Sequence, residues 1–429
     1  MIERAASARQ LRRATVAGMS LIEVLISMVL ALITFLVMFQ MFESWDRNKR
    51  STASGGGAMV TGAMAMFRLE RDLRLAGFGF GNASELGCTV TAYDPSRPNE
   101  AAVPPVSATA GGVFSFPLAA LQIVDGAAGA PDQVVALYGS SEGIAATRFF
   151  GTGAIGAKEY TGATSTTVTM EVGALGGVQQ GDLVVVAQNA TTCNVVEVTN
   201  NLNSDRRTFD FTGGNYTHSY TGAANTAPRY NDPGGLLVTS PTGHVYVLGP
   251  RPQRRIWQIR NNRTLAFAND LRWTDTVNNA TGAAGADNLN DFTDVADNVV
   301  NLQAEYGLVA TVTYAGTAIS GCTAGTTPVW TAVALPATCQ AFVWAVRVGL
   351  LARSDQFEKA WGVPANAGAA VAPQWAGGSF TMANADGTAD SFAAATLTAP
   401  SKDPNDWRHY RYRVFESIIP LKNVMWASR

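Results

Sequence analysis

Residues 139–143 have the sequence GSSEG, the spacing of a nucleophile elbow, in which a serine occupies a sharp turn between a strand and a helix. An apolar run precedes this segment, but residues 144–150 show no helical pattern. The chain has three histidines without a recognisable acidic partner in the sequence, namely His218, His244 and His409. We therefore interpret the segment as a polar turn between strands, and we expect neither enzymatic activity nor a bound cofactor.

Oxygen-bearing side chains gather between residues 287 and 298. They are Asp287, Asn288, Asn290, Asp291, Asp294, Asp297 and Asn298. Ca²⁺ prefers such ligands, and in this alternative Asp287, Asp291 and Asp294 would bind the ion. The cluster lacks the glycine and the terminal glutamate of an EF-hand loop. We favour an acidic turn that leads into a strand at Val299, with no metal.

Aromatic and basic residues are interleaved near the carboxyl terminus: Trp407, Arg408, Tyr410, Arg411, Tyr412 and Arg413. Such a pattern resembles a nucleic-acid-binding face. In a strand, however, Arg411 and Arg413 share one side and the tyrosines share the other. The net charge is −2, and it would be −5 without residues 1–18, with 27 basic and 32 acidic residues left. We expect a solvated strand face and no nucleic-acid partner.

The four cysteines are Cys88, Cys193, Cys322 and Cys339. They contain no CxxC pair, so zinc-ligand spacing is absent. Cys322 and Cys339 flank a loop rich in glycine, threonine and proline, which favours a local disulfide between them in an exported domain. Cys88 would then pair with Cys193, although three connectivities remain open.

An apolar segment near the amino terminus is predicted to anchor the chain in a membrane. Residues 24–42 are almost wholly apolar, and about 20 residues of helix cross a bilayer at about 1.5 Å per residue. Four arginines precede the segment, which predicts a cytoplasmic leader and an external domain. A cleaved signal peptide is the alternative. No small-residue cleavage site follows the segment, whereas small residues ending in Gly18 precede it.

Glu23 places a carboxylate at the start of this apolar helix, where an acid is costly and usually paired or functional. No lysine or arginine lies one helical turn away. Cleavage after Gly18 would create an α-amino group at Met19 that could neutralise Glu23. The alternative is an ordinary signal anchor with a snorkelling glutamate.

Gly18 before the cut and Glu23 as the fifth residue after it resemble the prepilin signature of type IV pilins and pseudopilins. Met19 departs from the phenylalanine that is usual in that family. The resemblance implies that a prepilin peptidase removes residues 1–18 and methylates the Met19 amine. It also implies that Glu23 sets the register of the subunit in an assembled fibre.

Beyond the apolar segment, the glycines at 55–57 predict a kink or a melted joint. A helix then resumes with one apolar face, formed by Met59, Gly62, Met66, Leu69, Leu73 and Ala76. We expect the charged residues of 68–74, Asp72 among them, to lie largely off that face, and Gly77 to end the helix.

Residues 78–130 carry several prolines and are predicted to be mostly loop. Alternating or apolar runs then predict strands at 133–138, 166–172, 182–187, 194–199, 208–211, 244–248, 255–260, 299–308, 339–354 and 410–421. We expect 244–248 and 255–260 to pair. The segments 310–338 and 361–402 are expected to be surface loops or hairpins.

Four segments resemble PilW-type minor pilins: FRLERDLRLAGF at 67–78, NLQAEYG at 301–307, VRVGLLARS at 346–354 and YRYRVF at 410–415. Residues 79–298 match that family only loosely. The resemblance implies an α+β, type IV pilin-like fold, in which a long amino-terminal transmembrane helix packs on an antiparallel β-sheet with an additional β-rich subdomain and loop insertions. The predicted units are a leader at 1–18, a transmembrane helix at 19–54, a second helix half with its connecting loop at 55–130, a β-rich subdomain at 131–250 and a carboxyl-terminal sheet at 251–429.

This resemblance implies a non-enzymatic subunit that helps to prime and assemble type IV pili. Its partners would be the prepilin peptidase, other minor pilins, the major pilin, a pilus tip protein and, before assembly, membrane lipid. It would cross the inner membrane once, with its carboxyl-terminal domain in the periplasm, and then enter the fibre. The alternatives are a type II secretion pseudopilin of the J kind and an adhesin that binds through the region 79–298.

Overall fold

The computed structural model describes most of the chain after its first nineteen residues. The described residues are 20–80, 86–93, 107–109, 113–140, 157–163, 167–170, 178–189, 192–201, 208–211, 214–224, 226–232, 243–271, 292–316, 318–357, 372–390 and 403–427. They fall into two compact units, Met1–Ala53 and Ser54–Arg429. The predicted processing residues Gly18 and Met19 lie outside the described residues.

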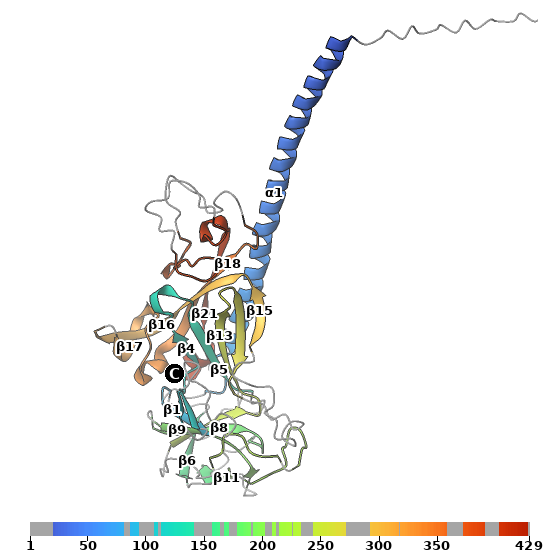
Figure 1. The fold of residues 1–429 in the computed structure, drawn as a ribbon. Coiled ribbons are helices and arrows are strands. Elements are labelled where there is room, and N and C mark those ends of the chain that lie inside the picture. The colour runs from blue at the N-terminus through green and yellow to red at the C-terminus, as the bar shows by residue number, and fades with distance from the viewer. Residues whose placement is uncertain are drawn as a thin grey trace, which may run out of the picture. The chain divides into compact units, whose positions relative to one another are not determined.

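The helix α1 (Leu21–Leu75) begins in the first unit and ends in the second (Figure 1). It contains no proline and remains helical through the glycines at 55–57, so the predicted melted joint is wrong. Helix propensity is a weak preference, and packing of the turns that follow outweighs it. The helix ends before Gly77, as predicted. Gly77 has a φ of 78°, and its N–H donates to the Leu137 carbonyl at 2.9 Å.

A ten-stranded sheet has the order β10-β11-β7-β6-β12-β8-β9-β1-β3-β2. Its strands are β1 (Thr89–Tyr93), β2 (Ser107–Thr109), β3 (Val113–Pro117), β6 (Ala157–Ala163), β7 (Thr167–Met170), β8 (Leu183–Asn189), β9 (Thr192–Glu197), β10 (Asn200–Asn201), β11 (Thr208–Asp210) and β12 (Gly243–Gly249). β1 runs parallel to β9, and the other pairings between described strands are antiparallel.

A five-stranded and a four-stranded sheet, both antiparallel, complete the main architecture. The first has the order β15-β14-β13-β5-β4, from β4 (Leu121–Val124), β5 (Gln133–Tyr138), β13 (Gln253–Arg260), β14 (Thr264–Asn269) and β15 (Thr293–Asp297). The second has the order β17-β16-β18-β21, from β16 (Val299–Ala315), β17 (Ala318–Thr331), β18 (Val343–Arg353) and β21 (Tyr412–Pro420). The smaller elements are η1 (Ala127–Gly129), η2 (Ala337–Phe342), β19 (Gln374–Trp375), β20 (Gly378–Ser379), η3 (Trp407–His409) and α3 (Lys422–Ala427).

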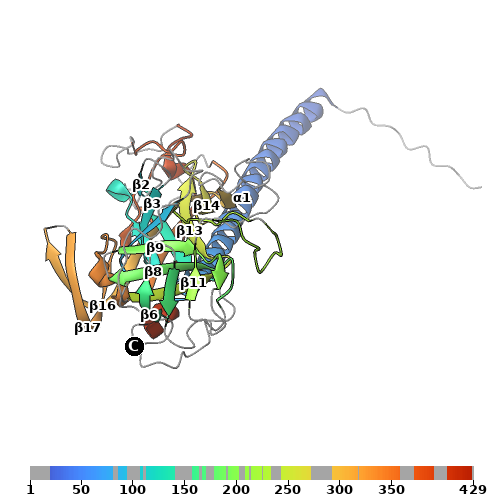
Figure 2. The same ribbon diagram turned by 90° about the horizontal axis from the view of Figure 1, so that it is seen from below.

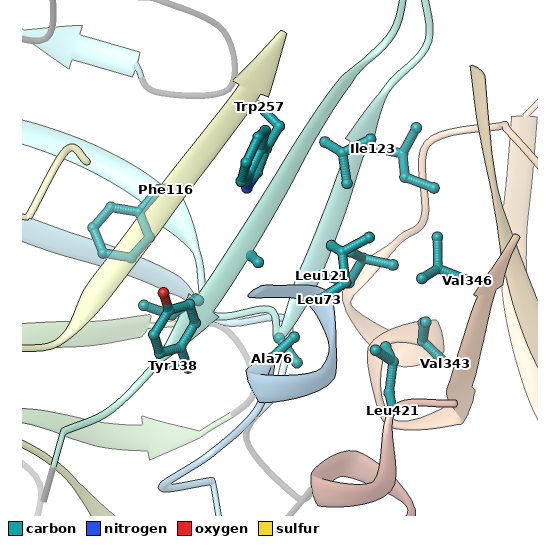
Figure 3. Packing of buried hydrophobic residues seen from close by; sticks show 14 of the residues in the cluster. Leu73, Ala76, Phe116, Leu121, Ile123, Tyr138, Trp257, Val343, Val346 and Leu421 are labelled. Carbon is teal, nitrogen blue, oxygen red and sulfur yellow. The ribbon is translucent and has the colours of Figure 1, made fainter. Parts of the chain in front are cut away.

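The main core lies where the end of α1 meets these sheets. Leu73 of α1 and Ala76, the residue that follows this helix, are fully buried among side chains from β4, β5 and β13 and from the four-stranded sheet (Figure 3). A second core fills one side of the ten-stranded sheet, around Val184, Phe209 and Val245. The whole is therefore α+β, with an amino-terminal apolar helix and a large β region.

Most strands lie where the sequence predicts them, but the predicted pairing and one predicted loop region differ from the structure. β5 matches its predicted range, and β8, β9, β12, β13 and β16 lie close to theirs. The prediction for the region 78–130 did not include β1 to β4, which lie in its described parts. β12 and β13 do not pair, because β12 joins the ten-stranded sheet and β13 the five-stranded one. The strands β1 to β4 were missed because they are short and lie among prolines, a composition that indicates loops. The pairing was wrong because the partner of a strand depends on segments that are distant in the sequence.

The two predicted insertions both contain hairpins. β16 and β17 extend as a long hairpin that continues beyond the other strands of their sheet (Figure 2). β19 and β20 form a short hairpin in the described part of the second insertion. The predicted strand at 339–354 begins instead as the 3-10 helix η2 and becomes extended only at Val343.

Candidate anchoring and assembly helix

The first part of α1, Leu21–Asp46, is the one described helix whose length and composition suit a membrane span. Its 26 residues extend about 39 Å at about 1.5 Å per residue, which exceeds a hydrocarbon core of about 30 Å. Its side chains are exposed throughout. A signal sequence near the amino terminus would have the same composition. The segment can therefore act as a membrane anchor or as a signal.

Two hydroxyl groups inside this segment are satisfied by the helix itself. Ser27 Oγ donates to the Val24 carbonyl and Thr34 Oγ1 donates to the Leu30 carbonyl, each at 2.8 Å. Such back-bonding leaves neither of these two hydroxyl donors unpaired toward lipid. Ser27 and Thr34 are thus compatible with an apolar environment.

Glu23 lies in the first turn of α1, three residues after Ser20. The Ser20 carbonyl accepts the N–H groups of Glu23 and Val24, at 2.9 and 3.1 Å, so Ser20 occupies the position before the helix. The spacing S-x-x-E is that of a capping box, in which the glutamate reaches back to the capping residue. A carboxylate here also favours the positive end of the helix dipole. This spacing is visible in the sequence, since Ser20 and Glu23 are three residues apart, but it was not part of the prediction for Glu23.

The carboxyl-terminal end of the apolar segment has a different chemistry. The Lys49 ammonium lies 5.2 Å from the ring centroid of Trp45, one turn earlier on the helix. Tryptophan and lysine are typical of the interface between lipid and water, where each keeps an apolar body and a polar tip. The pair would mark the end of a membrane span.

In the second unit, α1 is fixed to β13 through Asp72. The Asp72 carboxylate is buried and accepts two hydrogen bonds from Arg255 Nη1, at 2.8 and 2.9 Å, and one from Trp257 Nε1 at 3.2 Å. The prediction that Asp72 lies off the buried face is wrong. Its position, three residues after Leu69 and four before Ala76, places it on that face.

Close packing of α1 on β21 depends on Gly62. A Cβ atom at this position would lie 2.0 Å from Cε2 of Phe415, far inside van der Waals contact. Of the predicted apolar face, Gly62, Met66, Leu69, Leu73 and Ala76 are buried. Met59 is 60% exposed and does not belong to it.

Both disulfides are formed. Cys88, just before β1, joins Cys193 of β9, and Cys322 of β17 joins Cys339 of η2. This is the pairing that the positions of the cysteines favoured among three connectivities. Cys88–Cys193 links two adjacent strands of the ten-stranded sheet, and Cys322–Cys339 links the long hairpin to the segment that leads into β18.

The groups with catalytic potential are dispersed. Ser140 Oγ accepts the Arg251 N–H at 2.6 Å, and the rest of the GSSEG segment, from residue 141, lies outside the described residues. The three histidines lie in separate places: His218 in a buried turn, His244 in β12 and His409 in η3 beside Phe357. Within the described part of the chain, these groups do not assemble into a triad.

The calcium candidates are only partly described. Asp287 and Asp291 lie outside the described residues, and Asp294 lies in β15. Asp297 Oδ1 accepts the Thr264 hydroxyl at 3.1 Å. Among described residues, no group of three acidic, histidine or cysteine side chains could hold a metal ion.

Buried charges in the β region serve as structural anchors. Arg408, expected on a solvated face, is buried and paired with Asp406 and Asp390, while Arg411 and Arg413 are exposed as predicted. Arg229 pairs with buried Glu197 at 2.9 Å. Pairs of this kind hold loops against the sheets.

Asp182 belongs to another of these polar anchors. Burial raises the pKa of its carboxyl to about 6, and its Oδ1 accepts the Tyr220 hydroxyl at 2.7 Å. The contact ties the turn before β8 to the loop that carries Tyr220, and it indicates a structural role.

Residues 269–423 match the family model of the type IV pilus-assembly protein W, PilW. This part of the chain, 155 of 429 residues, is similar to PilW, and we call it the PilW-type domain. It contains β15 and the entire four-stranded sheet, including β21, on which α1 packs at Gly62. Searches of curated proteins and of solved structures found no match to the chain. The family connects the PilW-type domain with type IV pilus assembly.

Proposed function

We propose that this chain is a minor pilin that helps to prime and assemble type IV pili. The observation that carries the proposal is the presence, in one chain, of a PilW-type domain and an exposed apolar helix with an acid in its first turn. The helix first anchors the subunit in the inner membrane, with the larger unit in the periplasm. A structural subunit of this kind needs no catalytic site.

A prepilin peptidase cuts the chain after Gly18 and methylates the new amine at Met19. Extraction from the bilayer then exchanges lipid for neighbouring helices around the apolar segment. Burial of this exposed surface stabilises the fibre by about 25 cal/mol per Å². The other minor pilins, the major pilin and a tip protein supply the contacting surfaces.

Substitution of Glu23 tests the proposal, because a capping side chain and a charge partner make different chemical demands. As a capping residue it needs only hydrogen-bonding oxygen, which glutamine also supplies. As the partner of the Met19 amine it needs negative charge. We expect Glu23→Gln and Glu23→Ala each to lower the amount of subunit in sheared pili by about tenfold, or about 1.4 kcal/mol, with unchanged cleavage and membrane retention.

Ser27→Ala is the matched control, since it removes a polar group of the same segment whose bond is internal to the helix. Wild-type incorporation of Glu23→Gln alongside reduced incorporation of Glu23→Ala would leave Glu23 with a capping role only. A strain that lacks the chain should lose pili and retain protein secretion. The opposite result would identify a secretion pseudopilin.

A further inference from the structure

The turn between β4 and β5 is fastened to β16 by one buried carboxylate. Asp132, the last residue of this turn, is 1% exposed. Its Oδ1 accepts the N–H of Gly126, in the same turn, at 2.8 Å, and its Oδ2 accepts the N–H of Ala304 in β16 at 2.7 Å. The Asp132 N–H donates to the Leu302 carbonyl at 2.8 Å. Asp132 therefore joins the five-stranded sheet to the four-stranded sheet, and we call these contacts the Asp132 latch.

The latch covers a part of the β16 edge that β17 does not reach. The pairing of β17 with β16 stops at Tyr306, two residues after Ala304. At Leu302 and Ala304, β16 is paired with β18 on one edge and bonded to the turn on the other. Opening of the latch would therefore remove the partners of one backbone N–H and one backbone C=O of β16.

A second carboxyl group lies beside Asp132. Asp125, the first residue of the turn, is exposed and is hydrogen-bonded to Asp132. The other titratable group that faces Asp132 is Tyr306 of β16, whose hydroxyl donates to the Ile123 carbonyl at 3.4 Å. Among the described residues, no lysine, arginine or histidine forms an ion pair with either carboxyl. Two carboxylates in contact cannot both ionise without cost, so the closed latch favours one shared proton.

The affinity of the latch for this proton depends on its burial. Burial is the main reason why the pKa of Asp132 is raised to about 7; the two N–H donors lower it, and the charge of Asp125 raises it. Burial also raises the pKa of the Tyr306 hydroxyl above its ordinary value, so this group does not titrate in the same range. In an open turn, Asp132 would have the ordinary pKa of a carboxyl in water, about 3.9. The closed latch therefore loses stability as the pH rises from about 4 to about 7.

We propose that the Asp125–Asp132 carboxyl pair is a pH-sensitive switch, in which one shared proton fastens the turn 125–132 to β16 and loss of this proton to water releases it. Both carboxylates then carry a negative charge. Their repulsion, together with the cost of an ionised group in a buried position, drives the turn toward water. The switch does not depend on the proposed pilin function. It keeps the edge of β16 covered in acidic surroundings and makes it accessible in neutral and alkaline ones.

Hydrogen exchange of the full chain in detergent micelles tests the switch, with protection corrected for the intrinsic exchange rate. Between about pH 5 and about pH 8, we expect the protection of the Gly126 and Ala304 N–H groups to fall by about tenfold or more, because release of one proton changes an equilibrium up to about tenfold per pH unit. The Val348 N–H, in the interior strand β18, should keep its protection. Constant protection at Ala304, or a parallel fall at Val348, would overturn the inference.

Asp125→Asn separates the switch from a general effect of pH. The asparagine amide removes the like charge and can donate a hydrogen bond to the ionised Asp132 carboxylate. We therefore expect the turn to remain closed at about pH 8, with protection about tenfold higher than in the unaltered chain. Asp355→Asn is the matched control, because it makes the same change at an exposed acid in another part of the second unit. An unchanged pH profile in Asp125→Asn, or an equal rise in Asp355→Asn, would contradict a carboxyl-pair switch.

Discussion

The Asp72 carboxylate accepts hydrogen bonds from Arg255 and Trp257, two residues on one face of β13. These contacts span more than 180 positions of sequence. Helical spacing could have placed Asp72 on the buried face. Its partners Arg255 and Trp257 could not have been predicted in the same way, because the sequence around Arg255 does not indicate which helix this side chain contacts.

Asp72→Asn should therefore destabilise the second unit. Asparagine keeps the shape but loses the charge that Arg255 pairs with, and a hydrogen bond to a charged group contributes about 1.5–3 kcal/mol. We expect a loss near the lower end, about 2 kcal/mol, because Arg255 remains partly exposed to water. Urea unfolding of residues 54–429, followed by circular dichroism, measures it.

Glu70→Gln is the control for that experiment. Glu70 pairs with Arg74 on the exposed side of the same helix, and such pairs contribute about 0.3–0.5 kcal/mol. Equal losses for the two variants would show that the Asp72 contacts have no special weight.

At the scale of elements, the helix and most strands were predictable and their neighbours were not. The apolar runs that became β5, β8 and β12 are visible locally, since their composition reports burial. The separation of β12 from β13 into different sheets depends on where β5 and β8 lie. The prediction of a melted joint at the glycines 55–57 was wrong because helix propensity contributes little free energy compared with tertiary packing.

Two glycines of α1 should respond oppositely to alanine. Gly56 has open space around a Cβ position, so Gly56→Ala should stabilise the helix by up to about 1 kcal/mol. Gly62→Ala should destabilise by about 1–3 kcal/mol, because the added methyl meets the Phe415 ring. Unfolding of residues 54–429 compares them, and stabilisation by both changes would contradict the close approach.

At the scale of the whole molecule, the two disulfides close loops of very different length. Cys88 and Cys193 are separated by 105 positions, and Cys322 and Cys339 by 17. The apolar helix, the cysteines and the PilW-type segments were recognisable in the sequence. The ten-stranded sheet was not, because it combines strands from 89–117 with strands from 157–249.

Removing the disulfide that closes the longer loop should lower the free energy of unfolding more than removing the other. In the chain-entropy account, replacing Cys88 and Cys193 by alanine should lower the free energy of unfolding by about 4–5 kcal/mol. Replacing Cys322 and Cys339 should lower it by about 3 kcal/mol. Denaturation of the two double variants under non-reducing conditions gives the order, and a reversed order would show that native-state effects dominate.

The pairing of β5 with β13 also has a consequence in time. Tyr138 of β5 lies opposite Gln253 of β13, so β5 has to wait for a neighbouring strand that is made more than a hundred residues later. At about 5–20 residues per second, that interval is about 6–23 s. During it, β5 has only β4 as a possible partner in its sheet and leaves an apolar edge unpaired. The nascent chain is thus most vulnerable to misassociation before β13 emerges, and a holding chaperone would be most useful in that interval.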